Sequence, residues 1–530
     1  MRRPMKTAMQ VAIILGIAAA PLLPSAARGD DHSTPLNLDL KVAQATAGQT
    51  PPVPLAGVMP LSLRDSIVLS LRNNLDIQVE GFNPRINEQA LIGQKAVFDP
   101  SAFLELTRTD NRAPNSSSIS SGRTSVSDSW DYNTGLRQKI PTGGTYELRF
   151  NNEYFNNNTT PNPLLGDVRD TSRSFSSRFG LTLTQPLLKN FGFEANETNI
   201  RIATNNQSIS KEQLRLRVGN VVTLAQTGYF DLIFAIQSLQ VARQSLKLAQ
   251  DLVTLNKARV RAGVAAPVEV TQAEAQEAAR VQDVINGEKA VQDAGDTLKV
   301  VMNLPISGSW SQEIQPTDTP TSAVSPINLD ESIQKALENR YEYKSAKLDI
   351  ANKDLSVRLN RNLLLPDLSL TGSVFSNGSD TTYGGNISTM GSSHFISYSV
   401  GVILTVPLGN RAAQSSYIQS KLTLDQAKTS LKNLELQIVQ QVRAAVRTVE
   451  TNAKRIDANR SARILAEEQL RVEQRRLEAG VSTTFNVLQF QRDLSAAQAN
   501  EIQAITDYNK SLATLDNTLG TVLERNRIEM

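Results

Sequence analysis

The chain carries one pattern twice, and this duplication constrains its fold more than any other feature. Leu61–Asn73 begins LSLRDSI, and Ile327–Asn339 begins INLDESI, 266 positions later. Gly180–Pro186 (GLTLTQP) returns as Gly401–Pro407 (GVILTVP) after 221 positions. A repeat of this length predicts two similar structural halves, and it points to architecture more than to a catalytic pocket.

Two further landmarks repeat in the same order. Pro100 and Pro366 stand 266 positions apart, and Arg259-x-x-x-Gly263 returns as Arg476-x-x-x-Gly480 after 217. These landmarks divide most of the chain into two units. The predicted organisation is a first structural repeat over 61–304, a linker over 305–326, a second structural repeat over 327–524 and a tail over 525–530.

The first 27 residues read as a secretory signal peptide. Basic residues at positions 2, 3 and 6 precede the apolar stretch Val11–Leu23, and Ser25–Ala27 supplies small residues for cleavage. Residues 28–60 are rich in Pro, Ala and Thr and predict a flexible leader. The chain has 55 Lys and Arg against 52 Asp and Glu. Because three of the basic residues belong to the signal, the remaining charge is balanced and predicts no nucleic-acid partner.

Cysteine and histidine, the residues that most often form disulfides, bind metals or act as acid–base groups, are scarce. The chain has no Cys and only two His, which excludes disulfides and thiolate metal sites and disfavours His-based metal or acid–base chemistry. It contains no Walker loop, no Gly-x-Ser-x-Gly elbow and no metal-spaced cluster. The sequence therefore predicts neither an enzyme nor a cofactor. Beyond the signal, no run approaches the roughly 20 apolar residues of a membrane-spanning helix, and we expect a periplasmic, extracellular or outer-membrane protein.

Helical periodicity occupies most of both halves. Between Leu424 and Ile438, apolar residues follow the 3-4 spacing of a coiled-coil seam. The stretch 193–260 would measure roughly 100 Å as a helix. The two shorter helical stretches of the same half sum to nearly that length, so we expect them to stack end to end beside the long one. The predicted helices cover 62–97, 193–260, 267–303, 329–362, 411–477 and 484–523.

Alternating segments between the helices predict strands with one apolar face. Tyr398, Val400 and Val402 alternate with Ser399 and Gly401, a pattern that fits a barrel wall with lipid outside and water inside. A soluble β-domain carrying a helical bundle is the alternative. The predicted strands cover 101–110, 128–140, 145–155, 173–186, 366–376 and 395–406. The polar segments 111–127, 156–171 and 377–393 are expected to be extracellular loops.

The order and recurrence of these motifs resemble the TolC-like outer-membrane efflux protein family. The resemblance covers nearly all of 61–523. It implies a mainly α fold with membrane β structure, in which a duplicated strand/long-helix unit builds a trimeric outer-membrane β-barrel continuous with a periplasmic α-helical barrel. The residues that carry the resemblance are the strand–helix junction prolines Pro100, Pro186, Pro366 and Pro407, and the helix breaks Ala262-Gly263-Val264 and Ala479-Gly480-Val481.

The resemblance also implies a function and partners. Family members act as homotrimeric channel-tunnels in outer-membrane lipid, extend into the periplasm, and provide the exit duct for efflux or type I secretion of small molecules or proteins. A periplasmic adaptor couples them to an inner-membrane pump of the RND or ABC type. A periplasmic coiled-coil adaptor or a structural envelope protein is the alternative, because it too would show long helical hairpins.

One departure concerns the number of strands. The family contributes two strands per half, four per protomer and twelve per barrel. Here the hairpin 130–154, around the turn Pro141–Gly144, is additional. It could enlarge the barrel, lie in the lumen or extend outside, and the sequence does not choose among these positions.

The family pattern places the periplasmic entrance just after the helix breaks, where acidic residues ring the tunnel. Here the implied polar stripe keeps one acid in each half, Glu269 near the first break and Asp493 about two turns beyond the corresponding position. We predict that these two acids make the entrance cation-selective; a solvated helix face is the alternative for Asp493. The stripe consists of Glu269, Gln272 and Gln276 in the first half and Asn486, Gln489 and Asp493 in the second.

Closure of the entrance and docking of an adaptor are two further expectations. In some family members the first-half acid is tied to Tyr and Arg beside the second break, but the matching positions here are Leu477 and Ser482. Arg475 or Arg476 could substitute, with Glu269–Arg476 as the tie, unless Arg476 only faces solvent or neutralises a helix C-terminus. The glycines of the breaks can adopt the left-handed conformation that ends a helix. The hairpin tips at Gly263, Val264, Gly480 and Val481 are the expected docking surface for an adaptor.

Overall fold

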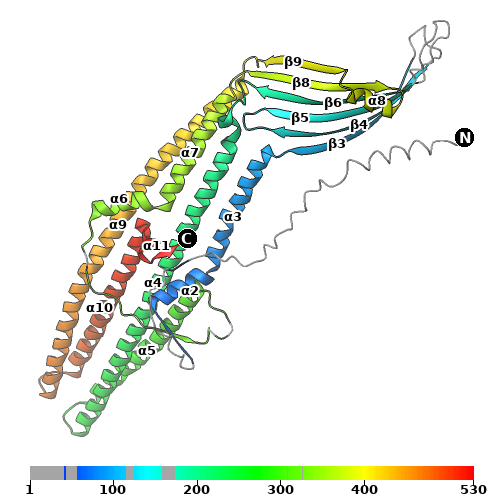
Figure 1. The fold of residues 1–530 in the computed structure, drawn as a ribbon. Coiled ribbons are helices and arrows are strands. Elements are labelled where there is room, and N and C mark those ends of the chain that lie inside the picture. The colour runs from blue at the N-terminus through cyan, green and yellow to red at the C-terminus, as the bar shows by residue number, and fades with distance from the viewer. Residues whose placement is uncertain are drawn as a thin grey trace, which may run out of the picture.

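The protein is elongated, with a sheet at one end and helices that run away from it to two separate tips (Figure 1). The computed structural model describes residues 41–42, 57–114, 124–157, 173–306, 308, 310–324 and 326–530. The predicted signal peptide and most of the predicted leader lie outside these residues. Within the described residues, no helix combines the length and apolar character required to cross a membrane.

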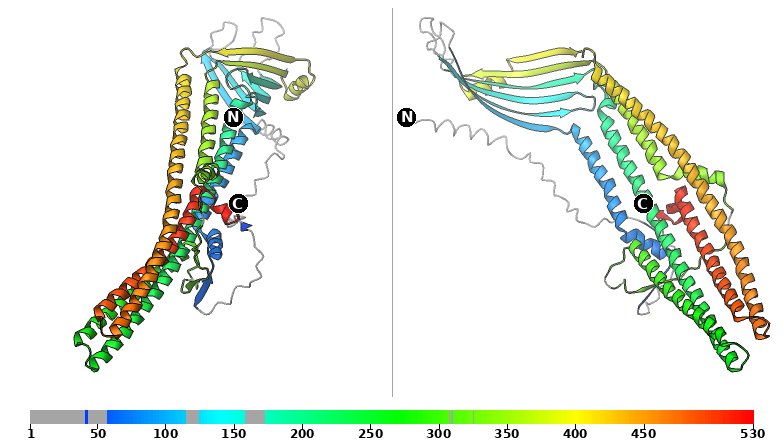
Figure 2. Two further views of the ribbon diagram at one scale, coloured as in Figure 1. Left: turned by 90° about the vertical axis from the view of Figure 1, so that its left-hand side faces the viewer. Right: turned by 180° about the vertical axis from the view of Figure 1, so that it is seen from behind.

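Six antiparallel strands form one curved sheet (Figure 2). Their positions match the six predicted segments with ends shifted by at most four residues. In their order across the sheet, the strands are β3 (Ser101–Pro114), β4 (Thr124–Lys139), β5 (Thr145–Asn157), β6 (Arg173–Pro186), β8 (Asp367–Asp380) and β9 (Ile396–Thr405).

The additional hairpin lies in the middle of this sheet. Strands β4 and β5 separate β3 from β6, and backbone pairing is continuous across all six strands. The first half therefore contributes four strands, as its alternating segments predicted, and not the two that the family resemblance implied. The sequence left the position of the hairpin open because residue alternation indicates which face a strand presents but not which strands pair with it.

The segment 377–393, expected to be a loop, is largely ordered secondary structure. Strand β8 continues to Asp380, and helix α8 (Tyr383–Gly391) follows. The Thr382 hydroxyl caps this helix by accepting from the Gly385 N–H at 3.2 Å. Asn386 is buried and donates to Ser177 of β6. The Gly- and Ser-rich composition suggested a loop, but a local cap and a buried amide hold a helix against the sheet.

Long helices of the two halves lie side by side below the sheet (Figure 1). In the first half α3 and α5 lie successively along α4, as the helix lengths predicted, and in the second half α7 and α10 lie in the same way along α9. Helix α4 also contacts α7 and α10 of the other half. The helices are α3 (Leu75–Lys95), α4 (Phe193–Arg261), α5 (Pro267–Val301), α7 (Tyr341–Asn362), α9 (Arg411–Glu478) and α10 (Thr484–Leu519).

The first predicted helix of each half is divided into two. Helix α2 (Leu63–Asn73) precedes α3, and α6 (Leu329–Asn339) precedes α7. The dividing residues Asn74 and Arg340 have extended ψ angles of 124° and 129°, and they stand 266 positions apart. The Asn74 side chain accepts hydrogen bonds from the N–H groups of Asp76 and Ile77 and so caps the N-terminus of α3. The duplication therefore includes the break that helical periodicity alone did not indicate.

Short strands near the middle of the helical region lie within the predicted leader, linker and tail. Strand β2 (Val58–Leu61) begins inside the predicted leader and pairs in parallel with β7 (Glu313–Pro316) inside the predicted linker. Strand β1 (Lys41–Val42) pairs with β10 (Ile528–Glu529) of the predicted tail, which follows helix α11 (Val522–Arg525). Isolated pairs this short depend on tertiary contacts, so a local pattern does not reveal them.

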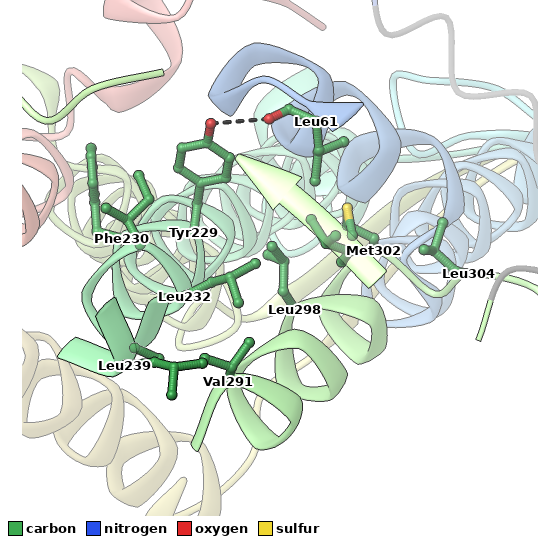
Figure 3. Close-up of a cluster of buried hydrophobic side chains, with 12 residues drawn as sticks. Leu61, Tyr229, Phe230, Leu232, Leu239, Val291, Leu298, Met302 and Leu304 are labelled. Carbon is green, nitrogen blue, oxygen red and sulfur yellow. Dashed lines mark hydrogen bonds between the residues drawn. The ribbon is translucent and has the colours of Figure 1, made fainter. Parts of the chain in front are cut away.

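A buried cluster fastens β2 to the long helices (Figure 3). Leu61, Tyr229, Leu298 and Met302 are almost completely buried within it. The Tyr229 hydroxyl donates to the Leu61 carbonyl at 3.0 Å and lies 3.2 Å from a carboxylate oxygen of Asp318. Burial raises the pKa of Tyr229 above its ordinary value of 10.0, so the phenol remains a donor at neutral pH.

Replacing Tyr229 with Phe tests this attachment. The substitution keeps the ring but removes the hydroxyl, so we expect a loss of about 1–3 kcal/mol in unfolding free energy and a lower melting temperature. Circular dichroism during thermal unfolding measures the change. The control is Tyr417→Phe, because the Tyr417 hydroxyl makes no hydrogen bond within the described chain; equal melting temperatures for the two variants would contradict the assignment.

Candidate functional site

Each helical hairpin ends in the same backbone motif. Gly263 and Gly480 adopt φ angles of +73° and +74°, the left-handed region that glycine tolerates best. At the first tip, the N–H of Val264 donates to the Arg259 carbonyl and that of Gly263 to the Val260 carbonyl. The second tip repeats these two bonds 217 positions later. Both helices therefore end in the Schellman motif, and the chain turns back at each tip.

The tips also present corresponding apolar side chains to solvent. Val264 and Val481 are each 66% exposed. Val268 and Phe485, four residues further on, are exposed as well. Large apolar side chains are therefore exposed to water at the ends of both hairpins, and exposed apolar surface of this kind often marks protein contacts.

A polar contact joins the two hairpins just behind their tips. Thr484, at the start of α10, donates through its hydroxyl to a carboxylate oxygen of Glu269 on α5 at 2.7 Å. The same hydroxyl lies 3.2 Å from the amide oxygen of Asn256 on α4. Asn256 donates in turn to the Glu269 carbonyl at 3.3 Å. Thr484 and Asn256 are completely buried, whereas Glu269 is partly exposed; this group of three residues is here called the inter-hairpin tie.

A second polar group lies at the tip of the second hairpin. Glu473 is 4% exposed, accepts from the Ser482 hydroxyl, and pairs with Arg476 at 3.1 Å. The hydrogen bond from Ser482 is the largest cause that lowers the pKa of Glu473 below its ordinary value near 4.5; burial opposes the shift and Arg476 supports it. Asn486 donates to Ser482 across the break at 3.4 Å.

The two groups are related by the 217-residue repeat with acid and amide exchanged. Asn256 corresponds to Glu473 before the break, and Glu269 corresponds to Asn486 after it. Each half therefore has one carboxylate and one amide at matching places. The conserved spacing of the repeat also places an arginine in each half: Arg259 lies 3.8 Å from Glu269, and Arg476 pairs with Glu473.

Asn256, Glu473 and Thr484 are not among the predicted entrance residues. The repeat itself could have revealed the first two, because it aligns Asn256 with Glu473 at the same distance before each break. Thr484 aligns with Pro267, so no comparison between the halves could indicate its role.

The structure distributes the predicted entrance residues over two surfaces. Asn486, Gln489 and Asp493 are exposed on one face of α10, where the Gln489 amide donates to Asp493 at 3.0 Å. Gln272 is exposed on α5, and Gln276 lies beside Arg280 of the same helix.

Glu269 is the predicted entrance residue that reaches the other hairpin. Its side chain is 27% exposed, so the carboxylate both bonds to Thr484 and keeps contact with water.

Within the described chain, the expected tie between Glu269 and Arg476 does not form. Arg476 is exposed but pairs with Glu473 of its own helix, whereas Glu269 is occupied by Thr484 and Arg259. Arg475 is exposed beside it. Glu473 captures Arg476 because it lies three residues earlier, one helical turn away, and is already held by Ser482.

The predicted junction prolines lie at the ends of strands. Pro100 and Pro366 immediately precede β3 and β8, Pro186 is the last residue of β6, and Pro407 follows β9. Proline lacks a backbone donor and therefore ends strand pairing where each helix connects. The described residues contain no group of His, Cys, Asp or Glu side chains able to hold a metal ion.

Two equivalent helical hairpins below one amphipathic sheet define the class of outer-membrane channel protomers. The chain belongs to the outer membrane efflux protein family, whose model matches residues 155–304 and 332–521.

Individual relatives are distant. The chain is 26% identical to the outer membrane efflux protein BepC of Brucella suis biovar 1, over 67% of this chain and 74% of that protein. It is 24% identical to the outer membrane protein TolC of Vibrio cholerae serotype O1, over 63% of this chain and 74% of that protein. It is 22% identical to Nodulation protein T of Rhizobium leguminosarum bv. trifolii over 56% of this chain, and it spans 62% of the length of that relative.

Solved structures share the fold. The outer-membrane channel OprN superposes with a TM-score of 0.63 at 15% identity, over 89% of this chain and 94% of that one. VceC of Vibrio cholerae superposes with a TM-score of 0.63 at 14% identity, over 86% of this chain and 96% of that one.

Replacing Thr484 with Val tests the inter-hairpin tie. Valine matches threonine in shape, but the buried Asn256 and the Glu269 carboxylate lose a partner. We expect a cost of about 1–3 kcal/mol and roughly five-fold or greater local opening, measured as faster amide hydrogen exchange in 256–269 and 484–489. Thr484→Ser should restore protection, and Thr271→Val, at an exposed position of α5, should leave it unchanged. Unaltered exchange in Thr484→Val would show that the tie does not hold the hairpins together.

The lowered pKa of Glu473 predicts how the second tip responds to acid. A carboxyl whose folded-state pKa is depressed stabilises the fold above its ordinary value, near 4.5, and this contribution is lost as the pH falls through the lower folded-state pKa. Amide protection around Gly480 should therefore be constant at neutral pH and fall below about pH 4.5. Glu473→Gln should remove this pH dependence, whereas Glu478→Gln, at an exposed position nearby, should retain it. An acid response that persists in Glu473→Gln would refute the assignment.

Proposed function

We propose that the protein is a homotrimeric channel-tunnel that serves as an exit duct from the periplasm through the outer membrane. Family membership supports efflux or secretion as the process. The observation that carries the proposal is the combination of an amphipathic open sheet with roughly 100 Å of helix below it, because one chain builds only part of a wall. Three copies would complete both the sheet in lipid and the helical tunnel in the periplasm.

The exposed apolar tips support coupling to a periplasmic adaptor. Val264, Val268, Val481 and Phe485 would contact the adaptor, which would link the duct to an inner-membrane pump of the RND or ABC type. The inter-hairpin tie just behind the tips supports a periplasmic end that keeps a defined shape while a partner docks.

The acidic side chains of α5 and α10 near the tips support an acidic entrance. We propose that Glu269 and Asp493, each present three times in the trimer, favour cations there. Glu269 accepts from Thr484, and Asp493 accepts from Gln489, so each carboxylate has a polar partner within the chain. Arg259 lies 3.8 Å from Glu269 and reduces this preference.

Charge-neutralising substitutions test the entrance assignment. In planar bilayers under a KCl gradient, Glu269→Gln and Asp493→Asn should each lower the ratio of cation to anion permeability, and the double variant should lower it several-fold. Glu274→Gln removes a charge from the same helix, but Glu274 already pairs with Lys257 at 2.8 Å, so it should change the ratio little. An unchanged ratio in the double variant would remove both residues from the entrance.

The adaptor alternative makes different predictions for the purified protein. A duct requires detergent or lipid to stay in solution as an oligomer and conducts ions in a planar bilayer. An adaptor or structural envelope protein would remain soluble without detergent and would not conduct. Absence of conductance from a folded, detergent-dependent oligomer would also contradict the duct.

A further inference from the structure

We propose that three copies of this chain close one barrel of eighteen strands, in which β3 of one copy pairs with β9 of the next. The inference rests on the proposed trimer and deepens it, because it assigns the surfaces through which copies join. Each copy contributes all six strands of its sheet. The hairpin β4–β5 is then part of the wall and not an appendage of it.

The apolar face of the sheet runs without interruption through the additional hairpin. Five residues on five neighbouring strands form one row by direct pairing: Leu136 of β4, Leu148 of β5, Leu181 of β6, Val374 of β8 and Tyr398 of β9. Because side chains on paired residues point to the same face, these five side chains make a continuous band. A hairpin that projected from a smaller barrel would not need an apolar face in register with its neighbours.

The opposite face carries charges across the same strands. Arg149 of β5 lies between Gly135 of β4 and Gly180 of β6 in one row. Its guanidinium is 5.2 Å from the centre of the Phe103 ring, and Arg178 stands at the same distance from the Phe375 ring. The two glycines leave room for these rings, because a Cβ at Gly135 or Gly180 would lie under 3 Å from a Phe side-chain atom. Both phenylalanines are thus covered by arginines on the polar side, which identifies that side as the lumen.

The two outer strands supply the edges that must join. Strands β3 and β9 each pair with one neighbour, at opposite ends of the sheet order. They are 14 and 10 residues long, and both carry apolar residues on the same face as the band. With six alternating strands, β3 and β9 run in opposite directions, so an edge-to-edge contact between copies is antiparallel, like every other pair in the sheet. Unpaired backbone groups are not tolerated in lipid, and pairing with a second copy satisfies them.

The width of the barrel follows from the strand count. Barrel diameter grows roughly in proportion to the number of strands. Eighteen strands therefore enclose a lumen about 1.5 times as wide as twelve. The additional hairpin is the element that produces this difference.

Disulfide cross-linking tests the closure, and the absence of native cysteine from the sequence makes the background clean. Thr107→Cys on the luminal face of β3 is combined in turn with Ser397→Cys, Ser399→Cys or Gly401→Cys on the luminal face of β9, since the register between copies is not fixed. After copper phenanthroline oxidation in outer membranes, at least one pair should give a covalent trimer as the largest product. The single-cysteine variants are the controls and should remain uncross-linked.

A second cross-link tests whether the hairpin stays in the wall. Glu153 of β5 faces Ser176 of β6 directly, so Glu153→Cys with Ser176→Cys should form a disulfide within each chain of the assembled trimer. An electron cryo-microscopy map of the same purified oligomer should show eighteen strands.

The outcomes separate this inference from the proposed function. A trimer whose map shows twelve strands, or whose β5–β6 cross-link fails, overturns the eighteen-strand barrel and leaves the duct standing. A covalent ring of two copies, or a protein without a discrete oligomer, overturns the proposed trimer as well.

Discussion

The antiparallel contact between α4 and α10 joins the two repeats, and the remaining packing is arranged around it. Helix α4 lies against α3 and α5 of its own half and against α7 and α10 of the other. Hydrogen bonds follow this contact along the helices: Asn517 bonds to Asn220, Ser495 to Ser245 and Thr484 to Asn256. Apolar side chains such as Leu252 and Leu488 fill the space between the polar pairs near the tips. The repeats are therefore fixed relative to one another over most of their length, from the middle of the helical region to the tips.

The contact between α4 and α10 combines polar and apolar side chains, and near the tips it lies just behind the surface proposed to meet a partner. Each hydrogen bond across it contributes about 1 kcal/mol net, and together with the apolar side chains of the tips these bonds hold the two hairpins in a fixed relation. At each tip the carboxylate is already satisfied within the chain, Glu269 by Thr484 and Glu473 by Ser482 and Arg476. Neither acid is left buried without a partner, and the tips remain well formed while their outer surface stays apolar.

The repeat also determines how the chain enters and leaves the sheet. Pro100 and Pro366 immediately precede equivalent strands, Pro186 is the last residue of β6 and Pro407 follows β9, so both halves enter and leave the sheet in the same way. The hairpin β4–β5 lies between two of these fixed points. Its insertion widens the sheet by two strands. The junctions with the helices are not disturbed, because an added pair of antiparallel strands leaves the directions of the flanking strands unchanged.

Local patterns in the sequence determined the long helices, the six strands, the end-to-end stacking of shorter helices and the positions of Gly263 and Gly480. Those features depend on residues two to four positions apart or on a fixed repeat offset, and both are visible in one chain. The tertiary structure alone decided the place of β4–β5 within the sheet, the β2–β7 pair, and the partners of Glu269 and Arg476. The β2–β7 pair and the partner of Glu269 depend on contacts between distant segments: Thr484 reaches Glu269 from 215 residues away, because two hairpins pack together. The other two features depend on which nearby groups meet, since β4 and β5 pair with the strands next to them in the sequence and Arg476 pairs with Glu473 of its own helix. Periodicity predicts which side of a helix is apolar, but only packing determines which polar groups meet across it.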